Sequence, residues 1–151
     1  MGAFVLRCGT MDDLDALVTL EKRGFPADAF NRKQLRYLLG RAHGVFFVIE
    51  EDQQVRGSAV VLWRHGRAVA RLYSLVVDPA FQSRGLGDRL LTACEQAARN
   101  RGYRRLSLEV RGRNAKARRF YQQRGYQIVE ELAGYYGDGG NGVRLVKGLT
   151  S

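Results

Sequence analysis

The sequence predicts a mixed α/β fold with one central, mostly antiparallel twisted sheet of about seven strands, flanked by four helices. Short runs of β-branched and aromatic residues alternate with segments whose apolar residues recur at helical spacing. Three such runs between residues 44 and 77 are separated only by short polar turns, which favours an antiparallel meander. A long amphipathic segment then separates two further runs, which indicates a parallel pair. The predicted order is β-α-α-β-β-β-α-β-α-β-β, in a single domain over residues 1–151.

The first part of the chain carries signals for one strand and two helices. Thr10 is suited to cap a helix, and Asp13 is suited to complete a capping box with it. The apolar stripe that follows is broken by Gly24-Phe25-Pro26, and Asn31 is the expected cap of the next helix. We therefore expect a strand over 4–8, a helix from Thr10 to about Lys22 and a helix over 32–40.

The remaining elements follow from alternating patterns and from glycine. Residues 51–54 are the expected hairpin connection, and Gly57 is expected at a bulge. Gly102 and Gly125 end two helices, and a glycine-rich loop over 137–142 joins the last two strands. The expected strands cover 44–50, 55–63, 68–77, 104–110, 126–132 and 143–148, and the expected helices cover 85–101 and 114–124.

The charge and apolar content restrict the class of protein. The net charge is +10, and Arg supplies 21 of the 25 basic residues. These residues are spread along the chain without interleaved aromatic residues, so a nucleic-acid partner is not expected. No apolar run approaches the roughly 18 residues of a membrane span, and Met1–Arg7 does not resemble a signal peptide. We expect a cytoplasmic protein without membrane contact, either a monomer or a homodimer.

The cysteine and histidine residues give no sign of a metal site. Cys8 and Cys94 lie in apolar-periodic segments without metal-ligand spacing, so both are expected to be buried and reduced. His43 and His65 are isolated and are expected at the surface or in turns. No metal is therefore predicted.

The segment from Leu72 to Gly87 predicts an anion site, because an apolar strand leads through a glycine-bearing turn into a long helix. The first N–H groups of a helix lack intrahelical partners and carry partial positive charge, and glycine allows a phosphate to approach closely. The glycine spacing does not fit a dinucleotide fingerprint, and no Gly-Lys-Ser/Thr follows as in a Walker A loop. The candidate phosphate-binding residues are Gln82, Ser83, Arg84, Gly85, Leu86 and Gly87.

Three polar residues further along the chain complete the candidate site. Glu109 lies near the end of an apolar strand, where a carboxylate is suited to act as a general base. Asn114 and Tyr121 are two helical turns apart, so they share one helix face about 10 Å apart along its axis. Each also has a structural interpretation, with Glu109 as an arginine partner, Asn114 as a helix cap and Tyr121 as a core aromatic residue.

Together these motifs resemble the GCN5-related N-acetyltransferase (GNAT) family over nearly the whole chain. LYSLVVDPAFQSRGLGDRLL is similar to the acetyl-CoA motif of that family, Q/R-x-x-G-x-G/A. NAKARRFYQQRGYQ is similar to its second signature, N-x-x-A-x-x-x-Y-x-x-x-G-F/Y, with matches at Asn114, Ala117, Tyr121, Gly125 and Tyr126. The resemblance implies the GNAT fold with a splayed parallel pair, and acetyl-CoA as cosubstrate. It also implies acetyl-CoA contacts from the turn, from Asn114 and from the preceding strand residues Leu75, Val76 and Val77.

Within the family, the chain resembles the RimI-like protein N-terminal acetyltransferases, which act on a ribosomal protein. Leu108-Glu109-Val110-Arg111 and the later Tyr121 keep the spacing of the general base and general acid of that subfamily. Phe25-Pro26 is similar to the F-P between the first two helices of that subfamily, a region that helps to bind the acceptor, although Ala27 stands where tryptophan is common. Tyr135-Tyr136 followed by Asp138-Gly139 is similar to its Y-Y-x-D-G. The resemblance implies an amine acceptor, and we expect its identity to depend on Gly24–Phe30 and the 137–142 loop.

Three other functions are compatible with these residues. The acceptor could be a small-molecule amine such as a polyamine, an amino acid or an antibiotic. The chain could bind acetyl-CoA as a sensor without catalysis, or it could be a basic nucleic-acid-binding domain. Release of CoA in the presence of peptides or small amines distinguishes the enzymes from the other two classes.

Overall fold

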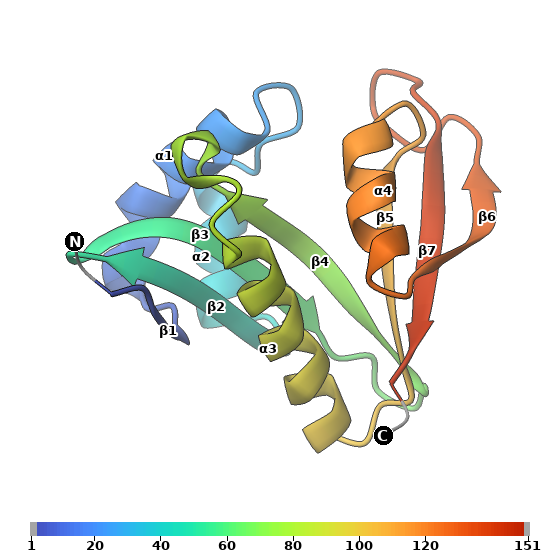
Figure 1. Cartoon of the computed structure of the whole chain (residues 1–151), viewed down its shortest axis with the longest axis horizontal. Coiled ribbons are helices and arrows are strands. Elements are labelled where there is room, and N and C mark those ends of the chain that lie inside the picture. The colour runs from blue at the N-terminus through green and yellow to red at the C-terminus, as the bar shows by residue number, and fades with distance from the viewer. Residues whose placement is uncertain (1–2, 150–151) are drawn as a thin grey trace. The chain divides into compact units, whose positions relative to one another are not determined.

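The structure, a computed structural model, describes residues 3–149 and confirms the predicted fold class and element order (Figure 1). The strands form one mixed sheet in the order β1-β2-β3-β4-β5-β7-β6. The strands are β1 Val5–Cys8, β2 Gly44–Glu51, β3 Gln54–Leu62, β4 Val69–Val77, β5 Arg105–Arg111, β6 Gln127–Leu132 and β7 Gly142–Gly148. The helices are α1 Leu14–Gly24, α2 Arg32–Gly40, α3 Leu86–Asn100 and α4 Ala115–Gln123, with short 3₁₀ helices at Met11–Asp13 and Pro79–Phe81.

The chain divides into two compact units, which we describe separately. The first unit contains the described residues up to Trp63 together with Leu72–Ala97, and the second contains Arg64–Arg71 together with the residues from Ala98 onward. Strand β4 contributes its first residues to the second unit and the rest to the first. The single domain inferred from the sequence stays a prediction.

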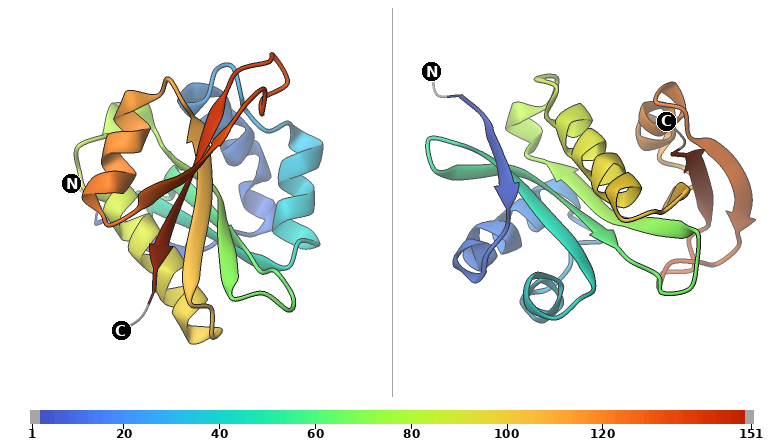
Figure 2. Two further views of the ribbon diagram at one scale, coloured as in Figure 1. Left: turned by 90° about the vertical axis from the view of Figure 1, so that its right-hand side faces the viewer. Right: turned by 90° about the horizontal axis from the view of Figure 1, so that it is seen from below.

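The first unit is a sheet covered by helices on both faces. Strand β2 pairs antiparallel with β1 and β3. Helices α1 and α2 lie on one face of this sheet and α3 lies on the other (Figure 2). Between α1, α2 and the strands, apolar side chains form a continuous buried cluster, namely Leu14, Leu17, Leu20, Leu35, Leu38, Phe46, Val48, Val60 and Val76. Burial of this cluster is the main source of stability for the unit.

The predicted cap at Asn31 is confirmed, whereas the helix predicted from Thr10 starts as the 3₁₀ helix Met11–Asp13, and α1 follows from Leu14 and ends later than predicted. The Thr10 N–H donates to Asp13 (2.8 Å), and Asn31 and Gln34 form a reciprocal capping box at α2. Helix α1 continues to Gly24 instead of about Lys22, because the Phe25 N–H donates to the Glu21 carbonyl (2.8 Å) and closes one more turn.

The β2–β3 hairpin is tighter than the sequence predicts. Its turn consists of Asp52 and Gln53 alone, both in the left-handed region with φ of 51° and 65°. Such a two-residue turn matches the twist of the flanking strands. The pairing register shifts between Ile49 and Glu50, so the predicted irregularity near Gly57 is confirmed, with Arg56 as the extra residue on β3.

The two cysteines have different environments. Cys94 is fully buried, as predicted, and desolvation raises the pKa of its thiol. The prediction for Cys8 is wrong, because this residue is exposed at the end of β1, an edge strand that has a neighbour on one side only. Over residues 3–149, every helix falls short of the length or apolar character needed to cross a membrane. The same residues contain no group of three His, Cys, Asp or Glu side chains that could hold a metal ion.

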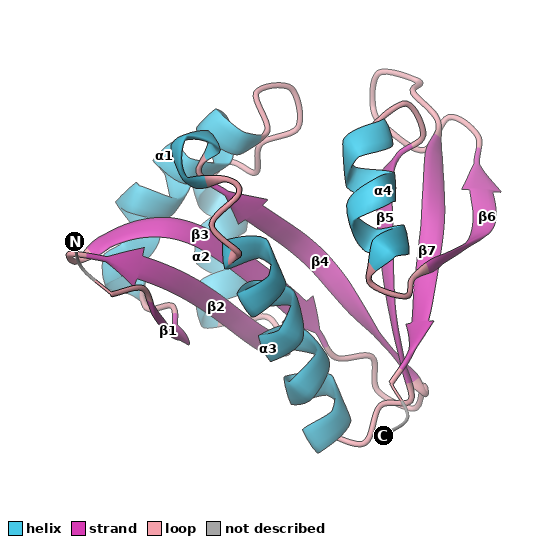
Figure 3. Ribbon diagram, viewed as in Figure 1, coloured by secondary structure: helices cyan, strands magenta, loops and turns pink. Residues whose placement is uncertain are grey.

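The second unit confirms the predicted parallel pair. The start of β4 pairs with β5 in parallel register from Val69–Arg105 to Arg71–Ser107. Strand β7 lies between β5 and β6 and is antiparallel to both. Helix α4 covers one face of these strands (Figure 3). Side chains on neighbouring strands therefore face one another across three adjacent ladders.

Candidate functional site

The path of the chain after β4 is fixed by Asp78, which is buried. Its carboxylate accepts from the Ala80 N–H (3.0 Å) and pairs with the Arg23 guanidinium (2.8 Å). The first bond caps the 3₁₀ helix Pro79–Phe81, in which proline occupies an early position that needs no N–H donor. Asp78 therefore links the end of β4 to the last turn of α1 and directs the chain into the predicted phosphate-binding turn.

The turn itself, Gln82–Gly85, is exposed and carries two residues in the left-handed region. The φ angles are 69° at Ser83 and 77° at Gly85, and Leu86, the first residue of α3, is buried. Successive backbone N–H groups in such turns can form a concave site that binds anions. A serine in this region is a costly conformation that is often retained at functional sites. Phosphate binding by this turn stays a prediction.

Two guanidinium groups flank this turn. Arg56 lies 4.2 Å from the centroid of the Phe81 ring, and Arg84 lies 5.3 Å from it. The Arg56 Nε is buried and has no hydrogen-bond partner in residues 3–149. The surroundings of the turn are therefore cationic, which favours an anionic ligand.

The strand residues Leu75–Val77 alternate in burial. Val76 is buried against the α1 side of the sheet, whereas Leu75 and Val77 are half-buried. Gly24 packs directly on Val76, since an added Cβ at Gly24 would lie 2.1 Å from Val76 Cγ2. Only glycine therefore allows the end of α1 to approach this part of β4 so closely.

In the second unit, Glu109 is half-buried as a residue, and both oxygens of its enclosed side chain are hydrogen-bonded. Oε1 accepts from Arg71 Nε (2.8 Å) and Oε2 accepts from Arg144 Nε (3.0 Å). The side chain of Glu109 is only 5% exposed. Arg144 stands directly opposite Glu109 in the β5–β7 register and opposite Glu130 in the β6–β7 register, and it pairs with both carboxylates. These acids raise the pKa of Arg144, with Glu109 as the larger cause.

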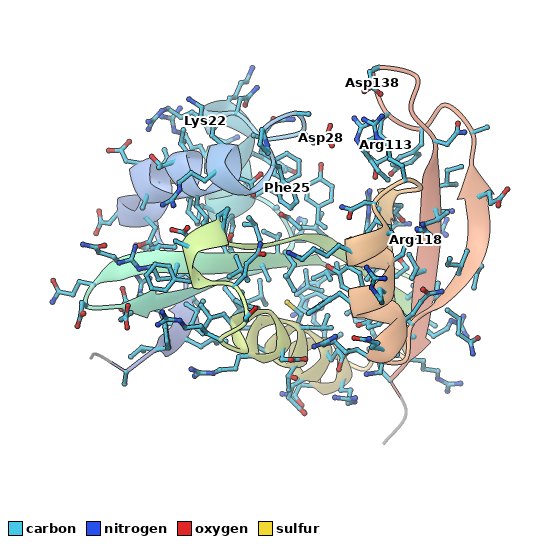
Figure 4. The ribbon with its side chains drawn as sticks, turned by 45° about the horizontal axis from the view of Figure 1, so that its top comes forward. Lys22, Phe25, Asp28, Arg113, Arg118 and Asp138 are labelled. Atoms are coloured by element: carbon cyan, nitrogen blue, oxygen red, sulfur yellow. The ribbon has the colours of Figure 1, made fainter. Side chains whose placement is uncertain are left out.

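Helix α4 carries the other two predicted site residues. Asn114 is the helix cap, since its side-chain oxygen accepts from the Ala117 N–H (3.1 Å). Tyr121 is buried, with edge-to-face contacts to Phe120 (5.1 Å) and Tyr126 (5.6 Å). Arg118 lies one turn after the cap (Figure 4), and its buried Nε has no hydrogen-bond partner in residues 3–149. This guanidinium, at a variable position of the signature, could pair with an anion.

The β6–β7 loop is held by arginine residues. Arg71 donates from Nη2 to the Tyr135 hydroxyl (3.0 Å), and Arg111 lies over the Tyr136 ring, 4.3 Å from its centroid. Arg111 also pairs with Asp138 (3.1 Å), and the Gly140 N–H and this arginine lower the pKa of Asp138. The loop between β6 and β7 is therefore held in place around its two tyrosines.

Sequence reasoning missed Glu21. This carboxylate on α1 is 2% exposed and has no ion-pair partner in residues 3–149. Desolvation raises its pKa, opposed in part by hydrogen bonds from the Phe30 N–H and the Ser74 hydroxyl. Its position, seven residues after Leu14 on the apolar face of α1, is the signal that could have identified it.

The predicted site residues therefore fall into two groups. The first unit holds Gln82–Gly87 and Leu75–Val77 near one another, and the second unit holds Glu109, Asn114 and Tyr121. Within the first unit, the exposed turn, its flanking guanidinium groups and the unpartnered Arg56 Nε fit an anionic ligand such as a phosphate group of acetyl-CoA. The roles of the individual residues stay predictions.

Comparison with known proteins identifies relatives of this chain. The model of the acetyltransferase (GNAT) family matches residues 14–126. An uncharacterized N-acetyltransferase of Methanocaldococcus jannaschii is 30% identical over 145 residues, which cover 87% of this chain and 64% of the relative. The [ribosomal protein bS18]-alanine N-acetyltransferase of Haemophilus ducreyi is 40% identical over 67 residues, which cover 44% of this chain and 46% of that protein.

A solved structure shows the same fold. The ribosomal-protein-S18-alanine N-acetyltransferase from Escherichia coli superimposes with a TM-score of 0.87 at 24% identity, over 99% of this chain and 96% of that chain. The chain spans less than two thirds of the length of the two curated relatives. The acceptors named for these proteins are properties of the relatives and do not identify the acceptor of the present chain.

Proposed function

We propose, since the chain belongs to the acetyltransferase (GNAT) family, that it transfers the acetyl group of acetyl-CoA to the α-amino group at a protein N-terminus. The observation that carries acetyl-CoA use is the exposed turn between β4 and α3, with Ser83 and Gly85 both left-handed. The acceptor class is supported by the similarity to relatives named for acetylation of a ribosomal protein, and by the ordered Tyr135-Tyr136 loop.

Acetyl-CoA would be held mainly by backbone groups. The N–H groups of Gln82–Gly87 would bind the pyrophosphate, and the edge of Leu75–Val77 would pair with the pantetheine arm. Arg56 and Arg84 would add long-range attraction for the phosphates. Asn114 would contribute by starting α4 at a fixed position, since its side chain caps that helix.

The reaction requires a deprotonated acceptor amine. An α-amino group has an ordinary pKa of about 8 and a lysine side chain one of about 10.4, so an N-terminal acceptor demands less of the base at neutral pH. We propose that Glu109 accepts this proton through water, and that the Tyr121 hydroxyl donates a proton to the departing thiolate. A backbone N–H within Leu75–Val77 would polarise the thioester carbonyl.

The two arginine partners of Glu109 define how it would act. Arg71 and Arg144 fix the carboxylate rigidly, and each oxygen keeps a further lone pair that could accept from a water molecule. Arg71 also donates to the Tyr135 hydroxyl, so one guanidinium connects the proposed base to the loop between β6 and β7, on which acceptor choice is expected to depend. Positioning of the two substrates would contribute more to the rate than either proton transfer.

The experiment that tests this function is a CoA-release screen. Each reaction contains the protein, acetyl-CoA and one class of amine. The classes are peptides with free N-termini, polyamines, amino acids and aminoglycosides. We expect release with peptides, and mass spectrometry should place the acetyl group on the α-nitrogen. Faster release with small amines would support the small-molecule alternative, whereas binding of acetyl-CoA without release with any amine would indicate a sensor.

A further inference from the structure

We infer that Glu21 is a positioning residue whose buried carboxylate fastens the α1–α2 segment, Phe25–Asn31, to strand β4 and so shapes the acceptor site. This inference rests on the proposed function, because that function gives the segment its role. All the atoms that carry it belong to the first unit.

The segment between α1 and α2 is attached at both ends and exposed in the middle. Phe25 and Phe30 are half-buried and pack against the core between α1, α2 and the sheet. Pro26, Ala27 and Asp28 between them are exposed (Figure 4). A short tip held between two anchored aromatic residues is a suitable surface for recognising a ligand.

Glu21 joins this segment to the strand. Its Oε1 accepts from the Phe30 N–H (3.1 Å), and its Oε2 accepts from the Ser74 hydroxyl of β4 at 3.5 Å. Beside this bridge, the Phe30 ring stacks on Tyr73 with 5.2 Å between centroids and 5° between planes. Ser74 directly precedes Leu75, so the bridge ends beside the proposed pantetheine-binding residues.

A buried carboxylate without a counter-ion needs a reason to be retained. Burial of such a group is costly unless hydrogen bonds compensate for lost solvation, and Glu21 has two donors and no cation in ion-pair distance within residues 3–149. An apolar residue would pack at this position, but it would remove the acceptor of the Phe30 N–H. The carboxylate is therefore explained by the segment that it holds.

The test compares three variants of the whole chain. Glu21→Met removes the acceptor atoms with little change in volume. Glu21→Gln keeps an amide oxygen for the Phe30 N–H and is the rescue variant. Glu95→Met removes another buried carboxylate of the first unit, on α3, and is the control. Steady-state kinetics give KM for the acceptor peptide and for acetyl-CoA separately, and amide hydrogen exchange by NMR reports on the Phe30 N–H.

For Glu21→Met we expect at least a tenfold rise in the acceptor KM, a change below twofold in the acetyl-CoA KM, and loss of Phe30 protection. Glu21→Gln should stay within about threefold of the parent protein in all three measurements, and Glu95→Met should keep the acceptor KM and the protection. If the Phe30 N–H of Glu21→Met exchanges as slowly as in the parent protein, Glu21 does not hold the segment and the inference is wrong. If the Phe30 N–H exchanges faster but the acceptor KM is unchanged, Glu21 has no role in acceptor binding.

Failure of the proposed function gives a different result. If the parent protein acetylates no amine, the role of Glu21 in acceptor binding falls with the proposed function, while hydrogen exchange still reports whether the tether exists. If Glu21→Met does not fold, Ser74→Ala replaces it, because this change removes the hydroxyl that links Glu21 to β4 and leaves the Glu21 side chain intact. The inference then expects the same rise in the acceptor KM, and an unchanged KM would overturn it.

Discussion

Replacement of Glu109 by glutamine should lower stability as well as turnover. The carboxylate accepts charge-assisted hydrogen bonds from Arg71 and Arg144 and is 5% exposed, whereas the arginine side chains are 24% and 33% exposed. Hydrogen bonds to charged groups contribute about 1.5–3 kcal/mol each, and the partial exposure of the arginines places these two near the lower end. Glutamine keeps one carbonyl acceptor, so we expect a net loss of about 2 kcal/mol.

Thermal unfolding monitored by circular dichroism measures this loss. For a chain of this size, about 2 kcal/mol corresponds to a fall of roughly 4–8 °C in Tm. Glu130→Gln is the matched control, because Glu130 pairs with the same Arg144 but is 52% exposed. Its effect should stay within about 0.5 kcal/mol. If Glu109→Gln unfolds at the parent temperature, the two guanidinium bonds do not stabilise the fold and the reasoning is refuted.

Three further predictions concern other parts of the structure. Gly24→Ala should destabilise the protein by about 1–3 kcal/mol, because its Cβ would meet Val76 Cγ2 at 2.1 Å; chemical unfolding measures this. Asp13→Asn should lower Tm near pH 7, where Arg7 holds the pKa of Asp13 below its ordinary value. That stability is present above the ordinary pKa and is lost as pH falls through the folded pKa, so the two melting curves should converge in acid. Tyr121→Phe should lower kcat by about a hundredfold, because it removes the proposed proton donor while the ring contacts remain; steady-state kinetics measures this.

Each of these predictions has a control of the same chemical kind. Gly148→Ala should be nearly neutral, since nothing lies within 4 Å of an added Cβ there. Asp15→Asn removes a carboxylate whose side chain is 87% exposed and should leave the pH dependence of Tm unchanged. Tyr37→Phe removes the hydroxyl of an exposed tyrosine and should leave kcat unchanged. If a variant and its control change the measured quantity by the same amount, the corresponding prediction is wrong.

The sequence was a good guide to the elements because their signals are local. The Asn31 helix cap, the helix start at Asn114 and the glycines after α3 and α4 are short-range patterns, and each appears where predicted. Cys8 was misjudged for a reason of longer range. Its strand looks apolar in isolation, and only the strand order places it at an exposed edge.

The site was predictable as a set of residues but not as an arrangement. Glu109 was a candidate from its motif, yet its contacts with Arg71 and Arg144 depend on the register of strands more than 30 residues apart. Glu21 was missed because its donors come from Phe30, beyond the helix, and from Ser74, 53 residues away. Local patterns identify helix caps and turns, whereas ion pairs across strands become visible only when pairing is known.

Acetyl transfer to an N-terminal α-amino group is tested most directly when an α-amino group and a lysine side chain of the same peptide compete as acceptors. A peptide with a free N-terminus and an internal lysine is incubated with the protein and acetyl-CoA, and fragment masses locate the new acetyl group. The lower pKa of the α-amino group and the proposed acceptor site both predict modification at the α-nitrogen alone. Acetylation of the lysine, or no acetylation of the peptide while small amines are modified, would contradict the account.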